Sequence, residues 1–312
     1  TIEKASVLPD TEERKRLLTV VVAGGGPTGV EVSGMLAELR KKVLRKDYPE
    51  LTGSGGGIYI VDQKSQLLAT MSAKSQQDAG KVLQNLGVKI VLGATVTDFE
   101  GGIVSLSNGD QIPAGTLIWT AGVAARAFEG IPSSSFGPGR RMLTDAFNKV
   151  ENVEDIYAIG DSCLQKTDPG FPKGHPQLAQ TAIQQGKWLA GNFRAMAAGR
   201  PLKPFSYYDK GVMAIMGRNS AVADLPLLKL HFNGFIALFI WLFIHLMSLV
   251  NYRNKLRTLY NWASAYITGD QSLRMIIRPV HENIAGSTVN KSSQRRPSVP
   301  EPVPFEQVGS SS

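Results

Sequence analysis

The hydrophobic pattern of this chain changes its period around residue 24. Residues 17–23 are apolar apart from Thr19 and carry three successive valines. Such a run is typical of a strand that is buried on both faces of a parallel sheet. After the glycines, apolar side chains return at three- and four-residue spacing: Val32, Met35, Leu36 and Leu39. This stretch therefore predicts a strand, a glycine-rich turn and a helix.

The turn has the sequence GGGPTG and fits the G-x-G-x-x-G pattern of dinucleotide-binding loops. Gly24 would permit the tight turn, Gly26 would let a pyrophosphate approach the backbone, and Gly29 would let the helix pack on the strand. The free N–H groups at the helix start would face the phosphates. The predicted nucleotide-binding residues are Gly24, Gly25, Gly26, Thr28 and Gly29. The alternative is a purely structural glycine turn.

A second apolar strand, 58–62, ends in Asp62. An acid at this place accepts hydrogen bonds from the adenosine ribose hydroxyls, and its charge repels a 2′-phosphate. Asp62 therefore favours NAD over NADP, unless it only caps a turn.

The pattern continues with a helix over 72–86, with Ser72 as its N-cap, and a strand over 88–92. Tight turns flank a strand at 103–106, and a last strand at 116–120 leads into Gly122. We therefore expect an α/β fold whose β-α-β-α-β unit is closed by a β-meander and one final strand.

Two further elements are predicted downstream. A short apolar strand over 156–159 ends in Gly160 and Asp161. A helix is expected to begin at His175 and to end near Ala198, where glycine and proline follow.

The run 235–250 is apolar all round, but its sixteen residues fall short of the ~20 that span a bilayer as a helix. An amphipathic helix follows over 252–267. Residues 229–279 hold six Lys or Arg and one Asp, a balance of +5. This combination favours a region that lies on a membrane surface without crossing it. A dimer interface and a true membrane span are the alternatives.

The composition narrows the function. The chain has 312 residues, enough for two modest domains, and a formal charge of +8. Nucleic acid or an anionic membrane could explain that charge; its location favours the membrane and not nucleic acid. The single cysteine, Cys163, excludes a disulfide framework and a cysteine-based metal cluster. No metal-ligand spacing and no catalytic Ser/His/Asp arrangement stands out.

Four blocks carry a resemblance to a known family: GGGPTGVE (24–31), Ala121-Gly122, YAIGD (157–161) and AQTAIQQG (179–186). In this order, before an amphipathic C-terminal region, they resemble the type II NADH:quinone oxidoreductases, which are two-dinucleotide-binding-domain flavoproteins. That family has two glycine fingerprints and this chain has one, so we expect the N-terminal part to be missing.

Composition predicts the two ends of the chain: the polar, charged residues 1–16 look like a linker or the end of something upstream, and 285–312, poor in large apolar residues, look like a disordered tail. Between them the resemblance implies three regions. These are a Rossmann-like NADH-binding domain with a β-meander (17–125), the C-terminal half of an FAD-binding domain (126–224) and a helical membrane-anchoring region (225–284).

The resemblance also implies roles. The residues that would bind the cofactors are Gly122, Gly160, Asp161, Ala179 and Gln180. Asp161 would hydrogen-bond a ribityl hydroxyl of FAD, unless it is only a turn residue after a strand. The helix starting near Ala179 would aim its N–H groups at the isoalloxazine of FAD.

Glu31 would lie near the nicotinamide and flavin, unless it is only a helix-start charge. Gln180, Ile183 and Gln184 share a helix face that would line a quinone pocket, with Gln180 and Gln184 acting in catalysis. From the residues alone, these glutamines could equally face solvent.

The implied function is hydride transfer from NADH to FAD and two-electron reduction of a membrane quinone, without proton pumping. Expected partners are the quinone, the lipid bilayer surface and a second copy of the chain. The place would be the cytoplasmic, or equivalent NADH-facing, side of an energy-transducing membrane. Alternatives are a non-catalytic NAD-binding membrane protein and a soluble flavin-dependent NADH reductase. Because Cys163 is the single cysteine, sulfide:quinone oxidoreductases and disulfide reductases, which need paired cysteines, are disfavoured.

Overall fold

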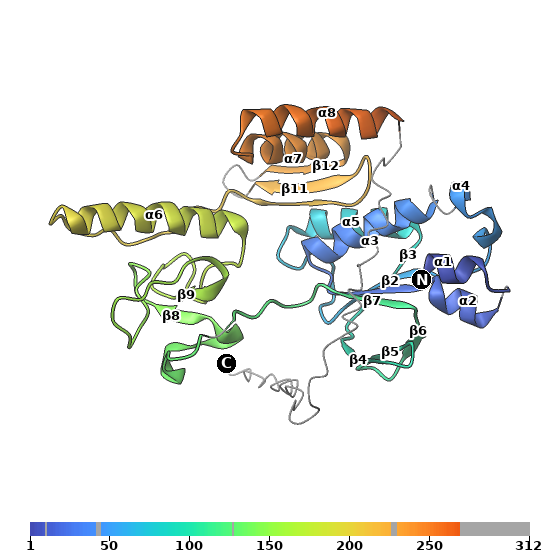
Figure 1. Cartoon of the computed structure of the whole chain (residues 1–312), viewed down its shortest axis with the longest axis horizontal. Helices are drawn as coiled ribbons and strands as arrows, with labels where there is room; N and C mark the ends of the chain where they lie inside the picture. Colours follow the sequence, from blue (N-terminus) through green and yellow to red (C-terminus); the bar gives the residue numbers. More distant parts are fainter. Residues whose placement is uncertain (10, 42–44, 127, 226–229, 269–312) are drawn as a thin grey trace, which may run out of the picture. The chain divides into compact units, whose positions relative to one another are not determined.

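The computed structural model of the chain describes residues 1–9, 11–41, 45–126, 128–225 and 230–268 (Figure 1). Residues 1–256 form one compact unit, and the described residues 257–268 belong to a second. The tail expected over 285–312 and the end of the region expected over 225–284 lie outside the described residues.

A four-stranded parallel sheet forms the centre of the first part of the chain. Its order is β3 (Val88–Leu92), β2 (Ile58–Asp62), β1 (Val20–Ala23) and β7 (Thr116–Trp119). The first strand begins later than the apolar run predicted, because residues up to Leu17 belong to a helix. The predicted β-α-β-α-β order is otherwise confirmed.

Both faces of this sheet are covered. On one face α3 (Pro27–Leu39) and α5 (Ala73–Leu86) bury Val30 and Leu83 against Ile60. On the other face, Val61 packs with the meander β4 (Val96–Glu100), β5 (Ile103–Leu106) and β6 (Gln111–Pro113). Neighbouring strand residues point to opposite faces, so an almost continuous apolar run is needed to fill both layers.

Residues 1–16, where the polar composition predicted a linker, hold α1 (Ile2–Ser6) and most of α2 (Glu12–Leu17). The Thr11 side chain caps α2 by accepting a hydrogen bond from the Arg14 N–H. Arg14 is buried and donates to the Ala5 carbonyl and to Ser54. These bonds fix a segment whose charge alone suggested exposure.

The middle of the chain contains a small parallel pair, β8 (Met142–Thr144) and β9 (Cys163–Gln165). The strand predicted over 156–159 is absent: Tyr157 makes one isolated bridge to Lys149. The helix predicted from His175 is α6 (Ala179–Ala197) and begins later. Pro176 disfavours the helical conformation of the residue before it, and Leu178 is an extended N-cap.

The C-terminal region begins with an antiparallel sheet that the sequence analysis did not anticipate. Its strands are β10 (Val212–Ile215), β11 (Ala221–Leu225) and β12 (Leu230–Asn233). The sheet packs on α3 and α5, and α7 (Gly234–Ser248) packs on β11 (Figure 1). A Cβ on Gly34 of α3 would lie 2.7 Å from the Met216 carbonyl oxygen, so only glycine allows this approach.

The amphipathic stretch near the C-terminal end forms α8 (Tyr252–Thr268), as predicted. Among the described residues, none of the helices combines the length and the apolar character that crossing a bilayer requires. The short elements are α4 (Arg45–Asp47), η2 (Pro49–Leu51), η3 (Ser133–Ser135), η4 (Pro138–Arg140) and η5 (Gly160–Ser162).

Candidate functional site

In the glycine loop between β1 and α3, Gly24 and Gly29 are required by the fold, whereas Gly26 has open space beside its backbone. Gly24 has a φ of 113°, a conformation that favours glycine. A Cβ on Gly29 would lie 1.8 Å from the Gly24 carbonyl oxygen, whereas a Cβ on Gly26 would meet no protein atom within 4 Å. Gly26 and Thr28 are exposed, and Gly25 is buried. The open backbone at Gly26 is what a pyrophosphate needs.

The start of α3 is also open. Gly26 is the N-cap and Pro27 the first helical residue, and no side chain caps this end. The N-terminus of α5, in contrast, is capped by the Ser72 side chain, which accepts from the Ser75 N–H. Uncapped N–H groups and the positive end of the helix dipole suit an anion. The residues present therefore fit a dinucleotide phosphate.

Asp62 ends β2 directly beside this loop. One carboxylate oxygen accepts a hydrogen bond from the Gly25 N–H, and the other accepts from the Lys64 N–H at 2.7 Å. A carboxylate has about four lone-pair positions, so these two bonds leave room for ribose hydroxyls. The turn-capping role and the ribose role, which the sequence presented as alternatives, are compatible in this geometry.

Glu31 of α3 points to the C-terminal sheet. Its Oε1 accepts a hydrogen bond from the Ile215 N–H of β10 at 3.2 Å. Burial raises the pKa of the Glu31 carboxyl, although this bond and the charge of His245 act in the opposite direction. Glu38, two helical turns later, accepts from the Arg218 N–H at 2.7 Å. Glu31 is therefore more than a helix-start charge, because it joins α3 to β10.

The turn before Asp161 is held by a residue that the sequence analysis missed. Gly160 has a φ of 64° and donates its N–H to Gln185 Oε1 at 2.6 Å. Gln185 is 1 % exposed and lies on the buried side of α6 with Thr181 and Leu189. A polar residue on the buried side of a helix was the signal that could have revealed it.

Asp161 itself is exposed, and Gln177 donates to its backbone carbonyl at 3.2 Å. Gly122, also exposed, has a φ of 71° and follows β7. The preceding residue, Ala121, lies against Gly24 in the glycine loop. The N-terminal end of α6, where Ala179 begins the helix, has no side-chain cap and so resembles the start of α3. These features fit anionic or polar groups of a flavin nucleotide.

The two glutamines of α6 engage the backbone in front of β10. Gln180 Nε2 donates to the Gly211 carbonyl at 3.0 Å, and its Oε1 accepts from the Lys210 N–H at 3.3 Å. Gln184 bonds both the N–H and the carbonyl of Tyr208, at 3.1 and 2.9 Å. Ile183, between them in sequence, is 56 % exposed. The amides thus face the segment 208–211, and an apolar side chain beside them is open.

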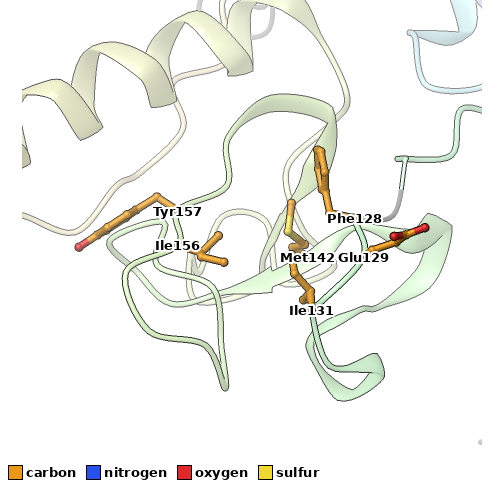
Figure 2. A pocket seen from close by; sticks show the side chains of 6 residues that line it. All are labelled: Phe128, Glu129, Ile131, Met142, Ile156 and Tyr157. Atoms are coloured by element: carbon orange, nitrogen blue, oxygen red, sulfur yellow. The ribbon is translucent and has the colours of Figure 1, made fainter.

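A pocket of about 360 Å³ lies elsewhere, beside β8. Figure 2 shows its lining residues, with the Tyr157 ring directed away from Phe128 and Met142. Only Tyr157 belongs to a block that carries the family resemblance. No group of three or more His, Cys, Asp or Glu within the described residues is arranged to hold a metal ion.

Two family models match this chain. Residues 1–186 match the family described as pyridine nucleotide-disulphide oxidoreductase, and residues 210–271 match the NDH2 C-terminal domain. The chain belongs to the type II NADH:quinone oxidoreductase family. The resemblance inferred from the four sequence blocks is therefore confirmed.

Two curated relatives illustrate the match. The type II NADH:quinone oxidoreductase Ndh of Mycobacterium tuberculosis is 34% identical over 274 residues, which cover 85% of this chain and 58% of the relative. The mitochondrial internal alternative NAD(P)H-ubiquinone oxidoreductase A1 of Arabidopsis thaliana is 33% identical, over 83% and 53% of the two chains. The chain thus spans somewhat more than half the length of these relatives.

A solved structure supports the fold. NDH2 from Plasmodium falciparum in complex with NADH superposes with a TM-score of 0.76 at 20% identity, over 85% of this chain and 69% of that one. The α/β fold of the pyridine nucleotide-disulphide oxidoreductases is therefore confirmed for this chain.

Proposed function

We propose that this chain provides the NADH-binding and quinone-facing parts of a non-proton-pumping NADH:quinone oxidoreductase. The observation that carries the proposal is the open backbone at Gly26, in line with the uncapped start of α3 and beside Asp62. FAD, when bound, supplies the chemistry of accepting a hydride and passing two electrons to a quinone. The chain's own residues bind, orient and tune charge.

The nucleotide part of the site rests on the glycine loop. Gly24 and Gly29 hold the turn closed, and the N–H groups of the first turn of α3 face the pyrophosphate. Asp62 takes the ribose hydroxyls and disfavours a 2′-phosphate. Glu31 follows on the same helix and sets the charge near the nicotinamide end, where its hydrogen bond to β10 fixes its direction.

The flavin part rests on two features of α6. Gln185 holds the turn at Gly160, which places Asp161 for a ribityl hydroxyl. The uncapped N-terminus at Ala179 and Gln180 directs N–H groups at the pyrimidine end of the isoalloxazine, where they stabilise negative charge.

The quinone part is assigned to Gln180, Ile183 and Gln184. The two amides are already hydrogen-bonded to segment 208–211. A quinone would therefore contact the exposed Ile183 side chain and the outer edge of these hydrogen-bonded amides. A quinone ring and isoprenoid tail need an apolar wall with a few polar groups, which this face offers.

The C-terminal region is proposed to hold the protein on the NADH-facing surface of an energy-transducing membrane. Its α7 exposes large apolar side chains at 55% or more: Phe235, Ile236, Phe239 and Phe243. Exposed Arg253 and Arg257 lie on α8, where they would meet anionic headgroups. A self-association face on α7, which would make a homodimer, is the competing use of the same side chains.

Anaerobic stopped-flow on the full-length protein tests the proposed reaction. NADH alone should bleach the flavin absorbance, and a soluble quinone analogue should restore it. Flavin that stays oxidised in excess NADH would favour the non-catalytic NAD-binding alternative. The variant that tests the glycine loop is Gly26→Val. It should fold, but its flavin should be bleached only at much higher NADH concentrations than in wild type.

Flotation with vesicles tests the membrane role. Wild-type protein should float with vesicles that contain anionic lipid, and Arg253→Gln/Arg257→Gln should float less. Equal recovery in the soluble fraction for both, together with a dimer in solution, would assign the apolar face to self-association.

A further inference from the structure

A histidine of the C-terminal sheet lies between two carboxylates. His231 of β12 has its Nδ1 3.0 Å from Asp224 Oδ1 and its Nε2 3.2 Å from Asp78 Oδ2. The side chains of His231, Asp224 and Asp78 are 18, 17 and 27% exposed. Asp224 belongs to β11 of the same sheet, whereas Asp78 belongs to α5 of the nucleotide-binding part. We call these three residues the His231 latch.

Asp224 makes a second connection between the C-terminal sheet and α5, at the beginning of that helix. Its Oδ2 accepts from the Ser72 N–H at 2.7 Å, and its Oδ1 accepts from the Ser72 and Ser75 hydroxyls at 2.9 and 2.8 Å. Burial raises the pKa of Asp224, but these bonds and the one from His231 outweigh it, so the pKa lies below the usual value. The carboxylate is held charged at the positive end of the helix.

Asp78 is also held in the charged form. Hydrogen bonds from Asn233 and His231, with the nearby charges of His231 and Lys81, lower the pKa of its carboxyl although burial acts against them. Asn233 Nδ2 donates to the same oxygen, Oδ2, at 2.9 Å. β12 thus sends two side chains, His231 and Asn233, to one carboxylate of α5.

The charge on the ring decides how many of these bonds can exist. An imidazolium has an N–H for each carboxylate, while a neutral ring has one N–H and one bare nitrogen. The other polar neighbour is the Ser75 hydroxyl, 3.1 Å from Nδ1. The charged groups in contact with the ring are Asp78 from α5 and Asp224 from β11, and Lys81 of α5 acts on Asp78. α7, which also packs on β12, carries no Asp, Glu, Lys or Arg.

The latch and Glu31 hold the same sheet at different strands. Asp224 lies opposite His231 on one side and Val212 of β10 on the other. Ile215, at the other end of β10, donates to Glu31 of α3. The sheet is therefore tied to α5 through β11 and β12, and to α3 through β10.

We propose that His231 is a positioning residue, which through its two ring nitrogens bridges Asp78 and Asp224 and so keeps the Ile215 N–H on Glu31. Loss of the bridge would let the sheet shift on α5 and loosen β10. The expected effect on NADH oxidation rests on the proposed function, because it requires Glu31 near the nicotinamide. The expected loosening of the sheet does not depend on the proposed function.

Hydrogen exchange of the full-length protein, followed by mass spectrometry at pH 7, tests the latch. The variants are His231→Gln and Asp78→Asn, with Asp110→Asn on an exposed turn of the meander as the matched control. Amides of β10 and β12 should exchange at least about tenfold faster in the first two variants, which corresponds to about 1.4 kcal/mol. In these two variants the exchange rates of the amides of residues 96–113 should stay at the wild-type values. In the control Asp110→Asn the exchange rates of β10 and β12 should stay at the wild-type values. Unchanged exchange at β10 in both variants would overturn the proposal.

Two further measurements sharpen the result. In the double variant His231→Gln/Asp78→Asn, the effect should be no larger than the greater single effect, because both substitutions weaken the same bridge. Additive effects would show that the two residues act separately. If His231→Gln does not fold, Asp78→Asn keeps the test, since it preserves shape and removes one charge.

The catalytic consequence has its own readout. In both variants NADH-driven flavin bleaching should slow, while reoxidation by quinone should keep its rate. Faster exchange at β10 with unchanged bleaching would overturn the link to Glu31 and leave a structural latch. Because exchange needs no turnover, failure of the latch and failure of the proposed function are distinguishable.

Discussion

The side-chain oxygen of Gln185 accepts a hydrogen bond from the backbone N–H of Gly160 at 2.6 Å, and both residues are buried. The bond ties the middle of α6 to the turn that presents Asp161. A second contact, from Gln185 Nε2 to Cys163 Sγ at 3.6 Å, extends the tie to β9. One amide thus connects the helix, the turn and the small parallel sheet.

Replacing Gln185 should therefore destabilise the turn. Gln185→Leu leaves the buried Gly160 N–H without an acceptor, which costs roughly 1–3 kcal/mol. We expect a lower thermal midpoint and faster loss of FAD on dilution. Lys187→Leu, on an exposed position of the same helix, is the control and should change neither. A midpoint equal to that of wild type would show that water or another group replaces the amide.

The glycine loop allows a test that separates binding from folding. Gly26→Ala adds a methyl group where no protein atom lies within 4 Å, at an ordinary φ of −73°. Its thermal midpoint should stay near that of wild type, while its Kd for NADH should rise at least about tenfold, the effect of ~1.4 kcal/mol.

Gly29→Ala is the matched variant with the opposite expectation. Its Cβ would lie 1.8 Å from the Gly24 carbonyl oxygen, so the strand and helix must separate. We expect poor folding with no separable effect on binding. Calorimetry and NADH titration of the two variants check the pair, and tight NADH binding by Gly26→Ala would contradict the assigned role of Gly26.

The elements that can be predicted from the sequence are those formed by interactions between residues close together in the chain. The β1–α3 unit could be predicted because its strand, turn and helix are encoded within about twenty residues. The late start of α6 and the absent strand at 156–159 reflect local backbone effects, at Pro176 and in a turn with positive φ at Asn152 and Asp155. An apolar run alone does not distinguish such a turn from a strand.

The site was harder to predict because its contacts are distant in sequence. Glu31 meets Ile215, and His231 meets Asp78, across more than 150 residues. Gln180 and Gln184 appeared as a polar face open to solvent or quinone, because their backbone partners around Tyr208 and Gly211 lie beyond the helix. No local periodicity reports such pairs.

Asp62 should set the choice of nucleotide. We expect a higher kcat/KM for NADH than for NADPH in the full-length protein, because the carboxylate repels a 2′-phosphate. Asp62→Asn keeps the shape and removes the charge, so it should narrow the gap mainly by raising the NADPH value. Equal values for the two nucleotides in wild type would contradict the assignment.

Glu31 should make stability depend on pH. Its pKa is raised in the folded protein by burial, so the folded state holds the proton more tightly than the unfolded state does. The resulting contribution is complete below the unfolded pKa and is lost as the pH rises through the folded pKa. Glu31→Gln cannot titrate but can still accept from the Ile215 N–H.

The thermal midpoint of Glu31→Gln should therefore match wild type near pH 4 and exceed it increasingly towards pH 8. Scanning calorimetry of both proteins over this range measures the difference. A difference that stays constant with pH would show that the carboxyl does not titrate differently on folding.

The two glutamines of α6 separate a quinone role from a flavin or structural role. If Gln180 and Gln184 line a quinone pocket, they act after the flavin is reduced. Gln→Leu at either position removes the amide bonds to segment 208–211 and a polar group that could hold a quinone carbonyl. Loss of one such bond typically costs ~0.5–1.5 kcal/mol, about 2- to 13-fold in kcat/KM for quinone. NADH-driven bleaching without quinone should change little.

Stopped-flow with the two half-reactions measured separately decides between these roles, with Lys187→Leu as the control on the same helix. A slower oxidative half-reaction alone supports the quinone assignment. Suppose instead that both variants lose the reductive half-reaction and that quinone turnover falls only in step with it. The amides then serve by fixing segment 208–211 in front of β10, which carries the partner of Glu31, and the quinone must bind elsewhere.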